Sequence, residues 1–148
     1  MTTLHNEILI VASIDKVWEA LTQIEMLEKF DPTVLRSVAT TATKSGLGAK
    51  RKVTMRDGKN WFEEEVTAFH PKQGLGYSLK ACSFPINDLR HTYIIASINE
   101  TVRVQQTMEY TVKWGILGRI MDALMIKGQT DKGIKMFLAG LKSYLESN

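Results

Sequence analysis

The sequence has few of the residues that build covalent or metal-held scaffolds. Its 148 residues include one cysteine, Cys82, and three histidines, His5, His70 and His91. A single cysteine excludes an intramolecular disulfide and fits a reducing compartment, so we expect a cytoplasmic protein. The histidines lack paired-ligand spacing, and no phosphate-binding loop or nucleophile elbow is present. We therefore expect neither a bound metal nor a cofactor.

Long apolar runs and a strong charge of one sign are also missing. No apolar stretch approaches the roughly 18 residues of a membrane span, and the N-terminal run MTTLHNEILIVAS has no basic flank, so it is typical of a strand rather than a signal peptide. The net charge is only +3. The basic cluster Lys50–Lys52 is matched by the acidic cluster Glu63–Glu65, so no basic stripe indicates a nucleic-acid partner.

The length and the order of hydrophobic patterns predict a single domain over residues 1–148. A strand is expected at 4–12, followed by a helix that begins after Ser13 and a second helical turn that ends at Pro32. Period-two patterns between turn residues then predict six strands, at 34–42, 47–56, 60–70, 74–82, 89–98 and 101–112.

The last third of the chain returns to a helical period. Apolar residues at three- and four-residue steps predict one amphipathic helix over 115–148, with Leu117, Ile120, Leu124, Ile134, Leu138, Leu141 and Leu145 on one stripe. The stretch KGQTDKG (127–133) interrupts it with two glycines, each costing about 1 kcal/mol relative to alanine. Asp131 lies on the same stripe. Either this stretch faces a cavity, or it is a kinked segment that faces solvent.

Six sequential strands joined by short turns predict an antiparallel meander, which twists and coils. One helix of about 45 Å can lie across its concave face but cannot fill the whole concavity. We therefore expect an α+β fold, with a seven-stranded curved antiparallel sheet wrapped around a long C-terminal helix and a pocket between them. Polar residues with inward parity are then informative, because burying them without a partner is costly.

The sequence resembles the START-related helix-grip superfamily (SRPBCC) over nearly its whole length. The opening IVASIDKVWEALTQIEMLEKFDP is similar to the first strand and two short helices of these proteins, and EEEVTAFHPKQGLGYSL and the closing YTVKWGILGRIMDAL…FLAGLKSYLE are also similar. Members include polyketide cyclase/dehydrases, pollen-allergen and abscisic-acid receptor proteins, and lipid-transfer domains. The resemblance implies the helix-grip fold and an apolar small-molecule ligand, but it does not select an activity.

By position, the segment ACSFPINDLRHTY (81–93) resembles the loop that closes over the cavity mouth in ligand-sensing members. Phe84 and Pro85 at its tip would form an apolar lid, whereas the alternative is an ordinary hairpin loop with one tucked aromatic. The receptors' own loop signatures are absent, so the resemblance does not imply hormone sensing.

Several further side chains are candidates for the cavity wall. Gln106 and Tyr110 share the inward face of the last strand. His91 and Tyr93 are expected inside because Arg90, on the opposite parity, is costlier to bury. Met121 and Met125 would supply an adaptable apolar wall. The ligand-binding candidates are Tyr77, Phe84, Pro85, His91, Tyr93, Gln106, Tyr110, Met121, Met125 and Asp131.

Glu64 could face the cavity, because it shares a strand face with Phe62 and Val66. A carboxylate in an apolar pocket would have a raised pKa and could act as a general acid or base. The alternative is that Glu63–Glu65 form a solvated run paired with Lys50–Lys52 on the next strand.

Two functions follow from these observations. The first is a non-catalytic carrier or sensor that binds a small, largely apolar molecule, as a monomer or homodimer. The second is a polyketide cyclase/dehydratase-like enzyme that uses Glu64, His91 or Tyr93 as catalytic groups. A module that binds protein partners would need an exposed apolar patch, of which the sequence gives no strong sign.

Overall fold

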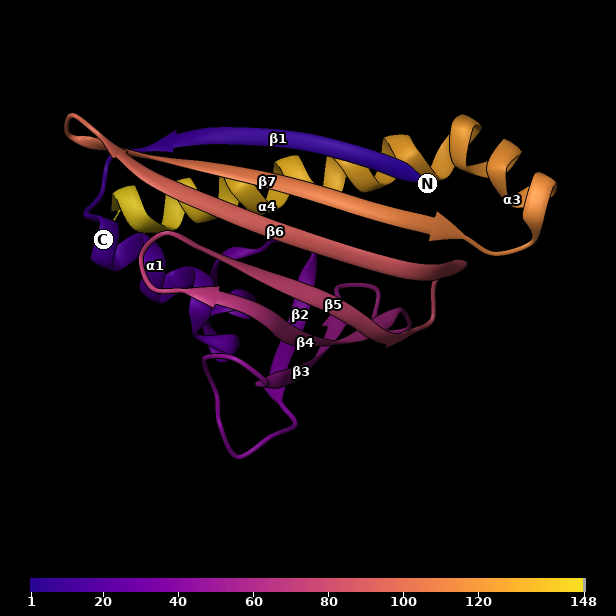
Figure 1. Ribbon diagram of the computed structural model, residues 1–148, viewed down its shortest axis with the longest axis horizontal. Coiled ribbons are helices and arrows are strands. Elements are labelled where there is room, and N and C mark those ends of the chain that lie inside the picture. The colour runs from indigo at the N-terminus through magenta and orange to yellow at the C-terminus, as the bar shows by residue number, and fades with distance from the viewer. Residues whose placement is uncertain (148) are drawn as a thin grey trace.

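The computed structural model, described here for residues 1–147, contains one curved antiparallel sheet of seven strands in the order β1-β7-β6-β5-β4-β3-β2 (Figure 1). The strands are β1 (Thr2–Ile10), β2 (Val34–Ala39), β3 (Lys50–Met55), β4 (Trp61–His70), β5 (Gly74–Cys82), β6 (Ile86–Ile98) and β7 (Thr101–Val112). Strands β2 to β7 form the expected meander, and β1 closes its far edge against β7.

Helices follow β1 and close the chain, as the sequence predicts. They are α1 (Ile14–Thr22), the 3-10 turn η1 (Ile24–Met26), α2 (Leu27–Phe30), α3 (Gly115–Met121), the π-helical turn η2 (Asp122–Ile126) and α4 (Lys127–Ser147). The Ser13 hydroxyl caps α1 by accepting a hydrogen bond from the Lys16 N–H at 3.3 Å. This is the expected helix-grip fold.

Helix α4 runs alongside β1 (Figure 1) and carries the C-terminal half of the predicted apolar stripe into the core. The stripe residues buried there are Ile134, Leu138, Leu141 and Leu145. α4 also packs on α2 at Gly140, where an added Cβ would lie 2.1 Å from the Phe30 carbonyl oxygen. Only a glycine permits this close approach of the two helices.

Most strand boundaries lie within two residues of the prediction, and three differ from it by three residues. β2 ends at Ala39 and β3 begins at Lys50, because Gly46 and Gly48 adopt positive φ angles of 91° and 85° in the loop between them. β6 begins at Ile86, three residues earlier than expected, because Ile86 pairs with Val112 of β7. The predicted loop at 81–93 is therefore reduced to residues 83–85.

The prediction that the whole C-terminal stripe packs on the sheet was wrong for its first half. Leu117, Ile120 and Leu124 are exposed, because α3 projects beyond the end of β7 (Figure 1) and η2 contacts the sheet through its opposite side, where Asp122 lies. Gly128 borders open space, since nothing lies within 4 Å of where its Cβ would be. It does not mark a close approach to the sheet.

The two glycines Gly128 and Gly140 give a matched test of this packing. We expect Gly128→Ala to stabilise the protein by up to about 1 kcal/mol, since it improves helix propensity without a clash. Gly140→Ala should destabilise it by about 1–3 kcal/mol, since its Cβ would overlap the Phe30 carbonyl. Urea unfolding of both variants measures the two effects, and equal signs would contradict the described contact between α2 and α4.

Candidate functional site

A cavity of about 450 Å³ lies between the sheet and the C-terminal helical segment. Most of its wall is apolar and includes Leu27, Met55, Phe62, Leu79, Met108, Ile134 and Phe137. Polar side chains are fewer, among them Asp31, Arg51, His91, Tyr93, Gln106 and Thr130. The volume and the lining are those of small-molecule pockets, which combine apolar walls with a few placed polar groups.

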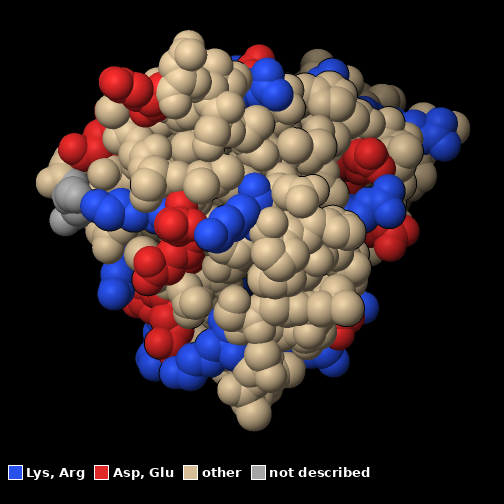
Figure 2. All heavy atoms as spheres, turned by 60° about the vertical axis from the view of Figure 1, so that its left-hand side comes forward, with Lys and Arg blue, Asp and Glu red and all other residues tan. Residues whose placement is uncertain are grey.

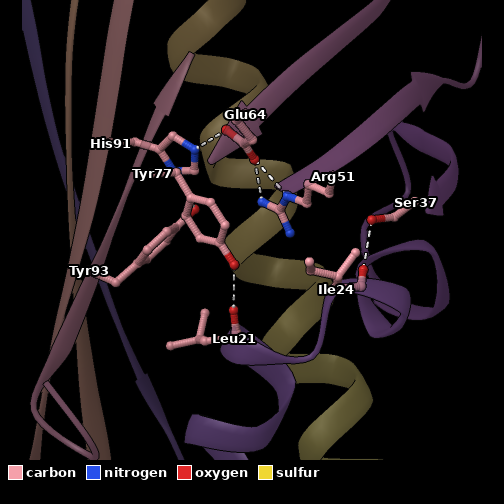
Figure 3. A network of polar contacts seen from close by, with 8 residues as sticks. All are labelled: Leu21, Ile24, Ser37, Arg51, Glu64, Tyr77, His91 and Tyr93. Atoms are coloured by element: carbon pink, nitrogen blue, oxygen red, sulfur yellow. Dashed lines mark hydrogen bonds and ion pairs between the residues drawn. The ribbon is translucent and has the colours of Figure 1, made fainter. Parts of the chain in front are cut away.

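A buried ion pair supports one side of this cavity (Figure 3). Arg51 of β3 and Glu64 of β4 are cross-strand partners, and the Arg51 Nε donates a hydrogen bond to Glu64 Oε1 at 2.7 Å. The Arg51 Nη2 contacts the same oxygen at 2.5 Å, and both side chains are buried. The Tyr77 ring lies 4.2 Å from the guanidinium carbon, which adds a cation–π contact.

The protonation state of Glu64 follows from these contacts. Burial by itself would raise the pKa of its carboxyl group, but the charge of Arg51 and the contacts with His91 outweigh burial and lower the pKa to about 2. Glu64 is therefore a carboxylate at neutral pH. The expectation of a raised pKa was wrong, because it considered the apolar pocket without the buried arginine.

His91 links this carboxylate to Tyr93. Its Nε2 lies 2.7 Å from Glu64 Oε2, and its Nδ1 lies 3.1 Å from the Tyr93 hydroxyl. Because an ionised carboxylate only accepts hydrogen bonds, the hydrogen resides on Nε2. In the neutral imidazole, Nδ1 then accepts from the Tyr93 O–H. The three side chains form one hydrogen-bonded chain, of which Figure 3 shows the contact between Glu64 and His91. The chain ends on the cavity wall, which His91 and Tyr93 line.

The two buried tyrosines of this site, Tyr93 at the end of the chain and Tyr77 beside it, stay neutral. Burial raises the pKa of Tyr93 and of Tyr77 above the ordinary value. Tyr77 stacks on the His91 ring at a centroid distance of 5.0 Å, and its hydroxyl donates to the Leu21 carbonyl at 3.2 Å. Tyr77 thus holds the imidazole plane in place from outside the cavity lining.

Two other polar groups of the wall are notable. Asp31 accepts hydrogen bonds from the Thr33 N–H at 2.9 Å and the Thr33 hydroxyl at 2.7 Å, but burial raises its pKa. The Gln106 side-chain oxygen is buried and has no hydrogen-bond partner among residues 1–147. Buried acceptors are rarely left unpaired.

Seven of the sequence-predicted side chains line the cavity, namely Phe84, Pro85, His91, Tyr93, Gln106, Met121 and Met125. As expected from strand parity, His91 and Tyr93 are buried and Arg90 is exposed. The segment KGQTDKG also contributes, through Gln129, Thr130 and Gly133. The glycine-containing segment 127–133 of α4 therefore borders the cavity.

Four predicted residues lie elsewhere. Glu64 and Tyr77 do not line the cavity. Glu64 contacts Arg51 and His91, and the Tyr77 ring stacks on His91. The Tyr110 hydroxyl donates to Asp122 Oδ1 at 2.6 Å, so it anchors the π-helical turn instead. Asp131 accepts from Asn6 Nδ2 at 2.9 Å and pairs with Lys135 at 2.5 Å, because its side of α4 faces the β1 edge of the sheet.

The sequence analysis missed Arg51 as a site residue, since it was counted with the surface lysines beside it. A signal was present, because Arg51 shares its strand parity with Ala49 and Val53, which are both buried. Both alternatives for Glu63–Glu65 were partly right. The cross-strand pairing exists, with Lys50 opposite Glu65, but its central pair is buried. Asp31 lies between elements and had no such pattern.

The buried pair predicts a specific acid sensitivity. The folded-state pKa of Glu64, about 2, lies below its ordinary value of 4.5. Its contribution to stability is therefore fully present above pH 4.5 and is lost as the pH falls toward 2. We expect the unfolding free energy of the wild type to decrease over this window. The unfolding free energy of Glu64→Gln should decrease less over the same pH range. At pH 7 this variant should be about 3–5 kcal/mol less stable than the wild type, because Arg51 is left unpaired.

Urea unfolding at several pH values measures both slopes. Glu65→Gln is the matched control, because Glu65 is half-buried and pairs with Lys50 at 3.9 Å and Lys80 at 3.3 Å. It should change neutral stability by no more than about 1 kcal/mol. A Glu64→Gln variant as acid-sensitive as the wild type would refute this assignment of Glu64.

Among residues 1–147, no three histidine, cysteine, aspartate or glutamate side chains converge in a way that could hold a metal ion. Within the same range, no helix combines the length and the apolar character that crossing a membrane requires.

Comparison with solved structures shows the same fold in distant proteins. An aromatase/cyclase from a Streptomyces species superposes with a TM-score of 0.83 at 11% identity, covering 98% of this chain and 93% of that one. A protein from Thermus thermophilus gives 0.82 at 16% identity, covering 99% and 98%. A START superfamily protein from Mycobacterium smegmatis gives 0.79 at 12% identity, covering 98% and 97%. These identities establish the fold alone.

Sequence comparison establishes the family. A search of curated proteins gave no significant match. In contrast, the sequence profile of the family described as polyketide cyclase/dehydrase and lipid transport matches residues 1–146, nearly the whole chain. The cavity under the helix, the seven-stranded sheet and this match agree, and the chain belongs to the polyketide cyclase/dehydrase and lipid transport family.

Proposed function

We propose that this protein binds a small, largely apolar molecule in the cavity between its sheet and C-terminal helix, as a carrier or sensor. The observation that carries the proposal is an apolar cavity of about 450 Å³ with a buried polar network on one wall. A fold that only needed stability would fill this space, since empty apolar volume lowers stability. The single cysteine, Cys82, fits action in a reducing compartment such as the cytoplasm.

The polar groups on the cavity wall indicate which hydrogen-bonding groups the ligand would carry. Arg51 uses Nε and one terminal nitrogen for Glu64, while its other terminal nitrogen points away from that carboxylate (Figure 3). An N–H donor there suits a ligand carbonyl or enolate oxygen. The unpaired oxygen of Gln106 suits a ligand hydroxyl or amine. We therefore propose an apolar body that carries both an oxygen acceptor and a hydrogen-bond donor.

A second candidate function is a cyclase/dehydratase-like enzyme, and the Glu64–His91–Tyr93 chain favours it. Tyr93 would take a proton from the ligand while its own proton moves to His91 Nδ1. The imidazolium formed would be stabilised by the Glu64 carboxylate 2.7 Å away. In this arrangement Tyr93 accepts the ligand proton, His91 acts as its base, and the Glu64 carboxylate orients His91, as in a catalytic triad. Arg51 would stabilise the enolate left on the ligand.

Filling the cavity should abolish ligand binding without harming the fold. Gly133 lines the cavity, and nothing lies within 4 Å of where its Cβ would be. We expect Gly133→Leu to weaken binding of the apolar anion anilinonaphthalene sulfonate, followed by fluorescence, at least about tenfold, since a side chain would occupy its place.

Gly128→Leu is the matched control, because it makes the same change in the same helix at a position outside the cavity lining. It should leave the affinity unchanged. If both variants bind the probe as the wild type does, the probe does not occupy the cavity, and the proposed function loses its support.

Removing the Tyr93 hydroxyl group tests whether the protein acts as a carrier or as an enzyme. Native mass spectrometry of the purified protein identifies a retained molecule, and β-polyketone mimics incubated with the protein are checked for loss of water. For an enzyme, Tyr93→Phe should reduce turnover about 100-fold or more, since it breaks the proton path. For a carrier, the mimics stay unchanged and Tyr93→Phe alters only affinity. Tyr77→Phe controls for the loss of a buried hydroxyl outside the cavity lining.

A further inference from the structure

The segment between β7 and α4 exposes an unusual number of large apolar side chains. The exposed fractions of Trp114, Ile116, Leu117, Ile120 and Leu124 are 60%, 74%, 63%, 52% and 82%. These five residues form what we call the outer face of α3 and η2. Steps of three and four residues join Leu117, Ile120 and Leu124, and Ile116 lies four residues before Ile120, so these side chains share one side of the helical turns. Patches of this kind mark sites of protein or membrane contact.

The outer face is held in position from its inner side. The Asp122 carboxylate accepts hydrogen bonds from the Tyr110 hydroxyl at 2.6 Å and the Thr2 hydroxyl at 2.5 Å. Gly118 is buried so closely against the chain that an added Cβ would lie 1.8 Å from the Lys113 carbonyl oxygen. The segment is therefore docked with its polar and small residues inward and its large apolar residues outward.

Trp114, which precedes α3, has an unusual backbone conformation. Its φ angle is 69°, in the left-handed region that is unfavourable for a bulky side chain. The indole group is mostly exposed, so burial in the core does not compensate for this conformation. Strained residues that are kept at the surface are indicators of function.

The charged side chains of segment 113–130 that reach the surface are all positive. Arg119 and Lys127 are exposed and Lys113 is half-buried, whereas Asp122, the acidic residue of segment 113–130, is buried. One further carboxylate, Asp88, lies at this end of the sheet, where it pairs in register with Thr111. On the side shown in Figure 2, turned away from α3, acidic and basic side chains are intermingled. The outer face thus combines exposed tryptophan and aliphatic residues with local positive charge.

We propose that the outer face of α3 and η2 docks on an anionic lipid surface. Amphipathic helices with basic flanks and exposed tryptophan or leucine lie in the interface of such membranes. A second copy of this chain fits less well, because a twofold contact would bring the cations of both copies together without exposed carboxylates of this segment to pair with them. The geometry also places the lipid beside the cavity, since Met125 lines the cavity and is 49% exposed next to this face.

Vesicle flotation with purified protein tests the proposal. We expect binding to phosphatidylcholine vesicles containing about 30% phosphatidylserine, little binding to phosphatidylcholine alone, and weakening at about 0.5 M NaCl. Lys113→Gln/Arg119→Gln/Lys127→Gln should lower the partition coefficient about fivefold for each cation removed. Leu117→Ser/Leu124→Ser should reduce binding to the background level, since it removes the inserted side chains.

Matched controls separate this face from general effects. Lys16→Gln/Lys29→Gln/Lys59→Gln changes the net charge equally at three exposed positions elsewhere. Leu47→Ser/Ile94→Ser changes two exposed apolar residues, 68% and 58% exposed, outside α3 and η2. Both controls should bind vesicles as the wild type does, and circular dichroism melting should show that all four variants are folded.

Three results would overturn the proposal: no binding to anionic vesicles, equal losses in the control variants, or a dimer in analytical ultracentrifugation that Leu117→Ser/Leu124→Ser dissociates. The test uses no cavity ligand and no cavity residue. Its failure is therefore distinguishable from failure of the proposed function, which the Gly133→Leu comparison measures separately.

Discussion

The buried pair of Arg51 and Glu64 is the interaction on which the rest of the site depends. Neither charge could stay in the interior alone, because an unpaired buried charge costs several kcal/mol. Because Arg51 and Glu64 are neighbours on β3 and β4, each charge neutralises the other. The pair places the Arg51 guanidinium group at the cavity wall. The pair also keeps Glu64 ionised, which fixes the His91 tautomer and in turn the direction of the Tyr93 hydroxyl.

The curvature of the sheet leaves room for the cavity, and it also limits where α4 can pack against the sheet. α4 buries Ile134, Leu138, Leu141 and Leu145 but borders empty space at Gln129, Thr130 and Gly133. At Gly140 it touches the α2 backbone. One helix therefore carries a tight contact, a cavity wall and, through the preceding η2 turn, an exposed end. Residue types change along the helix because these three environments follow one another.

The site illustrates why membership of a widespread fold leaves function open. The superposed proteins share the fold at only 11–16% identity, so the same backbone is built from largely different side chains. Binding and proton transfer would use the same wall here, since the Glu64–His91–Tyr93 chain orients a polar group whether or not a reaction follows. The chemistry of a ligand, rather than the scaffold, would separate a carrier from an enzyme.

The sequence by itself determined the element order and most of the inward faces. Alternation in β7 is local, so Gln106 could be placed inside before any contact was known. His91 and Tyr93 could be placed there because Arg90, on the opposite parity of β6, is costlier to bury. Only the tertiary structure decided what these groups meet. Arg51 became a cavity residue because β3 lies beside β4, whereas Tyr110 and Asp131 turned to Asp122 and Asn6. Likewise, the periodicity of Leu117, Ile120 and Leu124 fixed one helical face, but whether that face is buried depends on where the sheet ends.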